Sequence, residues 1–147
     1  MDDLPHVKTV LDSIELFPSD MLEDMISDFM NNPVTAEIWF TATENHVPVS
    51  IGYCAPEQLT QGTYNLLAIG VRSDLQGKGI GQAMMAYLEE KLRNNGHRVL
   101  IVETSGTEAF ELTRKFYTQM GYSKEAVIRD FWKEGDDKVV FWKKLNA

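Results

Sequence analysis

The sequence contains few residues able to form disulfides or bind metal ions. Its 147 residues include one cysteine, Cys54, and three histidines, His6, His46 and His97. A single thiol cannot form a disulfide framework or a cysteine-rich zinc cluster, and the histidines match no metal-ligand spacing. We therefore expect neither a disulfide-stapled scaffold nor a metal site.

Positive charge is also scarce. The chain carries 14 Lys and Arg against 22 Asp and Glu, which gives a net charge of −8 and an isoelectric point near 4.8. Nucleic acids and anionic membranes are bound by basic faces, so neither is expected as the main partner. An acidic surface can attract cationic substrates such as amines, although solubility alone also explains the charge.

Long apolar runs are absent from the sequence, and no stretch reaches the length that a bilayer span requires. The chain begins Met1-Asp2-Asp3 with no apolar run behind it, which is unlike a secretory signal. The length suits one domain. We therefore predict a cytoplasmic protein whose single domain covers residues 1–147.

Hydrophobic spacing predicts the order helix, helix, three strands, helix, strand, helix, two strands. The three consecutive strands suggest an antiparallel meander. The crossover from Ile69 through a helix to Val102 implies one parallel pair in a mostly antiparallel sheet, and hence an α+β (α/β) fold. The run 99–102 is expected to be buried on both faces, and Asp3 and Ser19 are candidate N-caps. The expected ranges are helices at 4–14 and 22–29, strands at 37–43, 47–55 and 63–71, a helix at 79–95, a strand at 99–102, a helix at 109–120, and hairpin arms at 126–128 and 139–142.

The stretch from residue 69 to residue 81 carries the clearest chemical signal. A strand runs into a loop in which Gly77, Gly79 and Gly81 are spaced two apart, and the loop runs into a helix. Glycines allow close backbone approach, and the first helix amides have no internal partner, so the pattern suits a pyrophosphate, with Lys78 adding charge. The spacing fits neither a Walker A loop nor the dinucleotide fingerprint. The alternative is an ordinary tight turn that caps a helix.

These residues resemble a known family motif. Gln76, Gly79 and Gly81 fill the pattern Gln/Arg-x-x-Gly-x-Gly/Ala, which is similar to the acetyl-CoA motif of GNAT acetyltransferases. The segment from Phe116-Tyr117 to Gly121-Tyr122 resembles the family's Phe-Tyr…Gly-Phe segment. The tail at 129–138 is similar to that of a subgroup of small members with unassigned substrates.

The resemblance implies a GNAT-like mixed sheet with helices on both faces, and acetyl-CoA as co-substrate. It implies direct attack of a primary amine on the thioester, with the Val71 N–H as oxyanion donor and pantetheine pairing with the strand around Ile69. A bulge at Gly70 is expected to open that strand. The residues implied to contact the cofactor are Ile69, Val71, Gln76, Gly77, Lys78, Gly79, Ile80, Gly81, Gln82, Phe116 and Tyr117.

By the same resemblance Tyr117 is the catalytic acid that protonates the departing thiolate. Glu103, at the end of the central strand, is our candidate for the catalytic base, followed by Asp130, and proton loss through ordered water needs neither. The competing interpretations are a core aromatic for Tyr117 and a solvated strand end for Glu103.

The chain departs from the family pattern at several positions. Phe110 stands where many members have a CoA-contacting Asn, and Asn65 lies where many have a carboxylate. The first residues suggest helix where the family usually has a short strand.

The acceptor stays open between a small metabolite, an antibiotic-like amine, and a peptide N-terminus or lysine. Competing functions are a CoA-binding sensor that does not catalyse and a nucleotide-binding regulator. Exposed strand edges are compatible with a homodimer.

Overall fold

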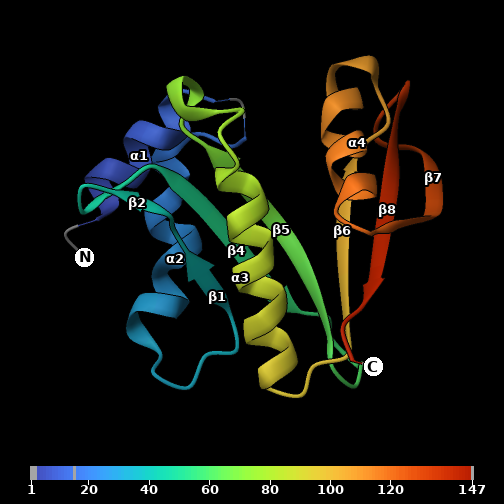
Figure 1. The fold of residues 1–147 in the computed structure, drawn as a ribbon, viewed down its shortest axis with the longest axis horizontal. Coiled ribbons are helices and arrows are strands. Elements are labelled where there is room, and N and C mark those ends of the chain that lie inside the picture. Colours follow the sequence, from blue (N-terminus) through green and yellow to red (C-terminus); the bar gives the residue numbers. More distant parts are fainter. Residues whose placement is uncertain (1–2, 15, 147) are drawn as a thin grey trace. The chain divides into compact units, whose positions relative to one another are not determined.

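The computed structural model describes residues 3–14 and 16–146, and its ribbon is drawn in Figure 1. The chain divides into two compact units. Unit 1 consists of Met1–Pro56 and Leu67–Leu88, and unit 2 of Glu57–Leu66 and Glu89–Ala147. One strand and one helix run from one unit into the other, so each unit is described below by itself.

The elements follow the expected order. The helices are α1 (Leu4–Asp12), α2 (Leu22–Asn31), α3 (Ile80–Asn94) and α4 (Glu111–Gln119), with short 3-10 helices η1 (Ser19–Met21), η2 (Ser73–Leu75) and η3 (Glu108–Phe110). The strands are β1 (Ile38–Phe40), β2 (Thr43–Glu44), β3 (Val47–Pro48), β4 (Ser50–Pro56), β5 (Thr63–Val71), β6 (Val99–Ser105), β7 (Ser123–Lys133) and β8 (Asp136–Lys144).

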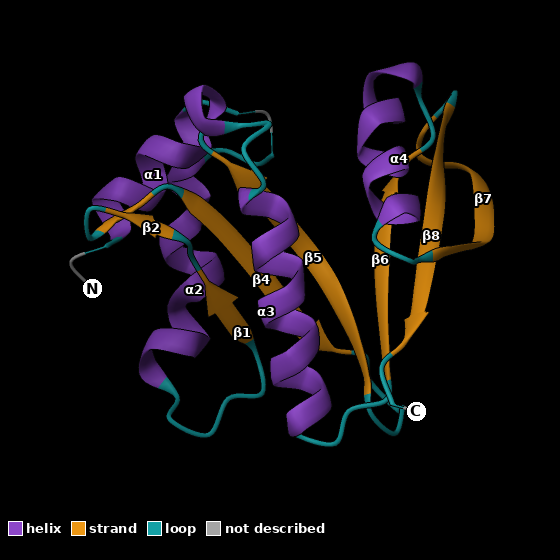
Figure 2. Ribbon diagram, in the orientation of Figure 1, coloured by secondary structure: helices purple, strands orange, loops and turns teal. Residues whose placement is uncertain are grey.

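Unit 1 packs helices against a short antiparallel pair of strands. β1 pairs with β4, so that Trp39 lies opposite Tyr53. In Figures 1 and 2, α1 and α2 lie on one face of β1 and β4, and the first half of α3 crosses the other face. The helical spacing of α1 turns its apolar side inward. The buried core of unit 1 includes Val7, Val10, Leu11, Leu22, Trp39 and Ile51.

Unit 2 contains the parallel pair. β5 runs parallel to β6, with Thr63 to Leu66 opposite Val99 to Val102, and β6 and β7 each pair antiparallel with β8. Figure 2 shows α4 lying against β6 and β8. Glu89 is buried, where it accepts hydrogen bonds from Tyr122 Oη at 2.7 Å and Lys143 Nζ at 2.8 Å. This network joins the second half of α3 to β8.

The strand order confirms the predicted fold class. Neighbouring strands follow the order β1-β4-β5-β6-β8-β7, and β2 and β3 form a separate pair. Among the described strands, the pairing of β5 with β6 is the parallel one. The sheet is therefore mixed and mostly antiparallel, as predicted from the crossover through α3. No described helix is both long enough and apolar enough to span a bilayer.

Three local predictions were wrong. β6 is not buried on both faces, because Leu100 and Val102 are buried whereas Val99 and Ile101 are only partly covered. The helix expected at 109–120 starts only at Glu111, after the separate turn η3, and Leu112 in its first turn is 79% exposed. Asp3 and Ser19 make no side-chain cap: Asp3 has helical backbone angles, and Ser19 is absorbed into η1.

A glycine in β5 has a packing reason. The bulge expected at Gly70 stays a prediction: β5 runs from Thr63 to Val71, and its pairing with β6 covers Thr63 to Leu66. A Cβ added at Gly70 would collide with Cδ1 of Ile14. Glycine at this position therefore lets the end of α1 pack closely against the strand.

Candidate functional site

In unit 1 the glycine-rich loop joins the end of β5 to the start of α3. The backbone of Arg72 donates to the carbonyl of Val49 at 2.8 Å, and that of Leu75 to Arg72 at 2.9 Å. The Leu75 side chain is buried. The first half of the loop is thus fixed to the body of unit 1 before the glycines begin.

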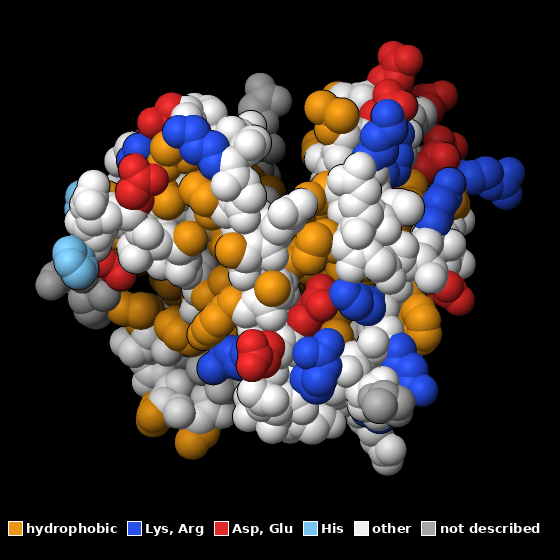
Figure 3. Space-filling view, in the orientation of Figure 1, with side chains coloured by type: hydrophobic (Ala, Val, Ile, Leu, Met, Phe, Trp, Pro, Cys, Tyr) orange, Lys and Arg blue, Asp and Glu red, His pale blue; other side chains and the backbone are white. Residues whose placement is uncertain are grey.

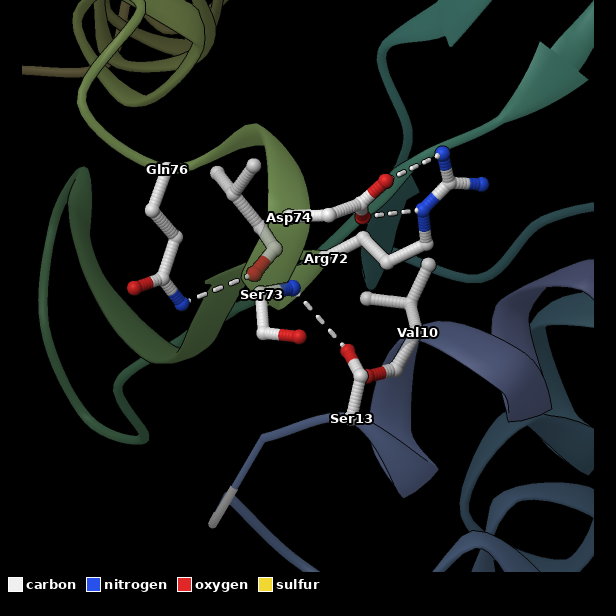
Figure 4. Close-up of polar contacts among 7 residues, drawn as sticks. Val10, Ser13, Arg72, Ser73, Asp74 and Gln76 are labelled. Atoms are coloured by element: carbon white, nitrogen blue, oxygen red, sulfur yellow. Dashed lines mark hydrogen bonds and ion pairs between the residues drawn. The ribbon is translucent and has the colours of Figure 1, made fainter.

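Figure 4 shows how side chains hold this loop. Gln76 Nε2 donates to the carbonyl of Val71 at 3.1 Å, so its amide folds back onto the strand end. The amide of Ser73 donates to Ser13 Oγ at 3.1 Å, and Ser13 Oγ donates to the carbonyl of Val10 at 2.7 Å. The loop is therefore tied to the C-terminal end of α1. The sequence analysis missed Ser13, because nothing local links residues 60 positions apart.

The two glycines that follow have backbone conformations that other residues rarely adopt. Gly77 has φ +79° and Gly79 has φ +84°. A Cβ added at either would meet nothing within 4 Å. Glycine is therefore favoured here by the left-handed backbone conformation and not by a lack of space for a side chain. The space beside the loop is open.

The start of α3 has backbone amides without an acceptor inside the helix, and its own first turn contains no acidic side chain. The first helical hydrogen bond runs from the Ala83 amide to Gly79 at 3.1 Å, so the amides of Ile80, Gly81 and Gln82 have no acceptor within the helix. The first turn contains no acidic side chain, and Lys78 is exposed beside it. Together with the helix dipole, this arrangement favours an anion.

The nearest acid of the loop is neutralised. Arg72 holds Asp74 through two bonds, Nε to Oδ1 at 2.6 Å and Nη2 to Oδ2 at 3.1 Å. The hydrogen bond from Arg72 is the main cause that lowers the pKa of Asp74. The Asp74 carboxylate is thus paired, and its repulsion of an anion at the loop is reduced.

Unit 1 also contains an apolar cavity that the sequence analysis did not anticipate. It has a volume of about 420 Å³, and hydrophobic side chains gather over β1 and α3 in Figure 3. Phe40 and Tyr87 pack together there, with ring centroids 5.8 Å apart. Its lining also includes Leu4, Val7, Ile26, Phe29, Met30, Trp39 and Ile51.

In unit 2 the candidate acid Tyr117 lies on α4 among aromatic rings. Its side chain is 2% exposed, with ring centroids 5.3 Å from Phe116, 5.8 Å from Tyr122 and 5.6 Å from Phe141. Burial raises the pKa of the Tyr117 hydroxyl above its usual value, so the proton stays on oxygen at neutral pH. In the described part of the chain the hydroxyl has no hydrogen-bond partner. Tyr117 therefore packs in the core and still carries a free donor.

Both candidate bases of unit 2 already have partners. Lys138 Nζ donates to Glu103 Oε2 at 3.2 Å, and both side chains are mostly buried. Asp130 accepts a hydrogen bond from the Gly135 amide at 3.0 Å. A base role for Glu103 would require its carboxylate to exchange this contact for the incoming amine.

The two departures from the family pattern, Asn65 and Phe110, both lie in unit 2. Asn65 is 3% exposed and donates to Glu57 Oε1 at 2.8 Å, while its Oδ1 is buried without a partner. Phe110 ends η3 and is partly exposed.

Cys54 is buried, and burial raises its pKa to about 12. It therefore behaves as a small hydrophobic residue rather than as a nucleophile.

Comparison with known proteins places this geometry in a family. The chain matches the acetyltransferase (GNAT) domain over residues 35–124, which include the glycine loop and Tyr117. It is similar to a GNAT-family protein from Desulfovibrio desulfuricans, with 30% identity, 98% of this chain and 93% of that chain covered, and a TM-score of 0.90.

Two further relatives show how widely the likeness extends. An uncharacterized N-acetyltransferase from Methanocaldococcus jannaschii is 29% identical over 86 residues, which cover 56% of this chain and 53% of that protein; the match thus spans about half of the relative's length. An acetyltransferase from Bacillus subtilis, solved in complex with CoA, shares the fold with a TM-score of 0.73 at 17% identity over 98% of this chain and 92% of that one. The chain therefore belongs to the GNAT family of acetyltransferases.

Proposed function

We propose that the chain transfers an acetyl group from acetyl-CoA to a primary amine of a small molecule or peptide by direct attack. The observation that carries this proposal is the loop at Gly77 and Gly79. Its left-handed backbone leads into a helix whose first amides are free. The B. subtilis relative was solved with CoA, which supports acetyl-CoA as the anion for this loop.

The amides of Gly77, Lys78, Ile80, Gly81 and Gln82 would bind the pyrophosphate, with the Lys78 ammonium as an additional charge. Gly79 would provide the backbone turn that lets these amides converge. The side chain of Gln76 would act indirectly, since it braces the carbonyl of Val71. Pantetheine would pair with β5 around Ile69 and Val71, and the family resemblance makes Phe116 and Tyr117 of α4 further candidate cofactor contacts.

The chemistry follows from the groups at hand. A neutral amine nitrogen attacks the thioester carbonyl, the C–N bond forms and the C–S bond breaks. The Val71 N–H would stabilise the developing oxyanion. The amine proton would leave to Glu103, to Asp130 or to water, and the Tyr117 hydroxyl would protonate the thiolate. Burial raises the pKa of the Tyr117 hydroxyl, which keeps it protonated at neutral pH and makes it a weaker acid. The proton that it gives to the thiolate would therefore be replaced by the proton that the amine releases.

Ligand-induced thermal stabilisation tests the cofactor assignment. Acetyl-CoA and CoA are expected to raise the melting temperature of the full chain, and ATP at equal concentration is not. Gly79→Glu should abolish the shift through bulk and repulsion of the pyrophosphate. Gly79→Ala is the matched control for the backbone alone, and because the added Cβ has open space it should weaken binding only through the strained φ. Undiminished affinity in Gly79→Glu would contradict the loop assignment.

A sensor that binds CoA without catalysis is the second candidate. The pairing of Glu103 with Lys138 favours it, because a carboxylate already occupied by an ammonium is less free to accept the proton of an incoming amine. Release of free thiol from acetyl-CoA in the presence of a broad amine panel separates the two functions. Tight CoA binding without thiol release from any amine would support the sensor.

The location and the oligomeric state stay predictions. A cytoplasmic location is expected from the sequence alone. We propose a homodimer on the ground that β7 ends the strand order and that its regularly paired part, residues 123–128, is exposed. Sedimentation velocity over a range of concentrations measures this association directly.

A further inference from the structure

The hairpin of β7 and β8 contains a large bulge. Ile128 lies opposite Lys138, and pairing resumes with Lys133 opposite Asp136. Residues 129–132 of β7 therefore face a single residue, Asp137, on β8. Bulges of this kind redirect side chains and occur frequently beside functional sites.

Reciprocal hydrogen bonds hold the bulge in one shape. Asp130 has φ +55°, an uncommon conformation for a residue with a side chain. Its amide donates to Asp137 Oδ1 at 3.0 Å, and its Oδ1 accepts from the Gly135 amide at 3.0 Å. Ser105 Oγ donates to Asp136 Oδ1 at 2.6 Å, which fixes the same turn to β6. Hydrogen bonds to Asp137 and to Gly135 thus hold Asp130 in its uncommon backbone conformation.

The bulge displays two large aromatic side chains. Phe131 is 48% exposed and Trp132 is 46% exposed, and their rings meet edge to face with centroids 4.8 Å apart. Lys138 Nζ lies 3.9 Å from the centre of the Phe131 ring, and Trp132 Nε1 donates to the carbonyl of Thr104 at 3.4 Å. The two rings therefore form a braced surface rather than a loose pair, and we refer to it as the aromatic platform.

Charge around the aromatic platform is largely balanced. Acidic and basic side chains are mixed over α4 and the β7–β8 hairpin in Figure 3. Four acids near the bulge have partners: Asp130 the Gly135 amide, Asp137 the Asp130 amide, Asp136 the Ser105 hydroxyl, and Glu103 the Lys138 ammonium. A polycation would find no free carboxylate among these four and would meet the charge of Lys138. What the platform presents is polarisable, apolar ring surface.

The platform lies at the end of β6 that carries the candidate base. Trp132 is hydrogen-bonded to the carbonyl of Thr104. Lys138 contacts the Phe131 ring and forms an ion pair with Glu103. One register step earlier, Val102 of β6 lies opposite Phe141, the ring against which the candidate acid Tyr117 packs. A substrate resting on the platform would therefore lie along the same short stretch of β6 and β8 as the groups assigned to proton transfer.

We propose that Phe131 and Trp132 bind the acceptor, and that this acceptor is a small primary amine joined by a short linker to an aromatic ring. The inference rests on the proposed acetyl transfer, since it names the substrate class of that site. Stacking on the platform would hold the ring and leave the amine at the Glu103 end of β6. Asp130, Asp137 and Lys138 are positioning residues that keep the platform in place.

Calorimetric titration of the full chain with 2-phenylethylamine and with n-butylamine, with and without CoA, tests the proposal. Because CoA carries no acetyl group, binding is measured without turnover. We expect 2-phenylethylamine to bind at least about 10-fold more tightly than n-butylamine to the wild-type chain. Phe131→Ala and Trp132→Ala should each weaken the aryl amine about 10-fold and leave n-butylamine unchanged, and Trp132→Phe should restore most of the affinity.

Phe29→Ala is the matched control, because Phe29 is a partly exposed aromatic on α2 (37%) that lines the cavity of unit 1. Its affinity for both amines should equal that of the wild-type chain. Equal binding of the two amines, no binding of the aryl amine, or a larger loss in Phe29→Ala than in Trp132→Ala would each overturn the proposal. The amine titrations measure binding and do not depend on turnover. If the proposed acetyl transfer is wrong, this is detected in a separate assay, as the absence of free-thiol release from acetyl-CoA.

Discussion

At the scale of single residues, Tyr117 combines two properties that rarely coincide. It is almost fully buried among three aromatic rings, yet its hydroxyl has no partner among the described residues. Among the described residues, Asn65 Oδ1 is the fully buried side-chain oxygen that lacks a partner, so the Tyr117 oxygen keeps some contact with solvent. A hydroxyl that solvent can reach fits a role in proton transfer, whereas packing alone would be served equally well by phenylalanine.

Tyr117→Phe is therefore expected to lower kcat roughly 10- to 100-fold while changing the affinity for acetyl-CoA less than about threefold. The effect should be moderate because a thiol is a tolerable leaving group even without an acid. Stability should stay equal or rise slightly, since the lost hydroxyl has no partner. Steady-state kinetics from pH 6 to 9 and thermal unfolding measure both, with Tyr53→Phe as a control from unit 1. An unchanged kcat at every pH would leave Tyr117 with a packing role only.

At the scale of elements, the glycine loop depends on a helix distant in sequence. Ser13, just after α1, accepts from the Ser73 amide and donates to Val10. A Cβ at Gly77 or Gly79 would meet nothing within 4 Å, so side-chain packing does not hold the middle of the loop. The hydrogen bond from Ser73 to Ser13 anchors the first part of the loop, and Ser13 would thereby affect the proposed cofactor site indirectly.

Ser13→Ala should raise the Kd for acetyl-CoA about 3- to 10-fold, because an unanchored loop loses more conformational freedom on binding. The free energy of unfolding should fall by about 1 kcal/mol for the lost hydrogen bonds. Ser27→Ala is the matched control, because its hydroxyl caps a carbonyl of α2 in the same way but does not contact the loop. Calorimetry with CoA compares the two, and equal affinities would mean that the loop orders itself without Ser13.

At the scale of the whole molecule, the features predicted from sequence are those encoded by neighbouring residues. The bounds of β5 and the start of α3 follow from hydrophobic spacing and from glycines beside it, and the structure confirms them. The bulge at 129–132 was not predicted, because it depends on the Asp137 carboxylate from the opposite strand. Ser13 was missed for the same reason: its partner is 60 residues away. Long-range contacts leave no periodic signal in the chain.

Global stability at alkaline pH offers a test of the buried core as a unit. Burial raises the pKa of the Cys54 thiol in the folded chain to about 12, from an ordinary value near 9. The unfolded thiol therefore ionises first, and stability present below about pH 9 is lost as pH rises toward 12, by roughly 1.4 kcal/mol per pH unit. Cys54→Ala should be less stable at pH 7, because it leaves a small cavity, but should lose less stability between pH 9 and 11. Urea unfolding at pH 7, 9, 10 and 11 gives the free energy of unfolding of the wild-type chain and of Cys54→Ala as a function of pH. Parallel curves would mean that the folded thiol ionises as readily as the unfolded one, and that the core around β4 admits water.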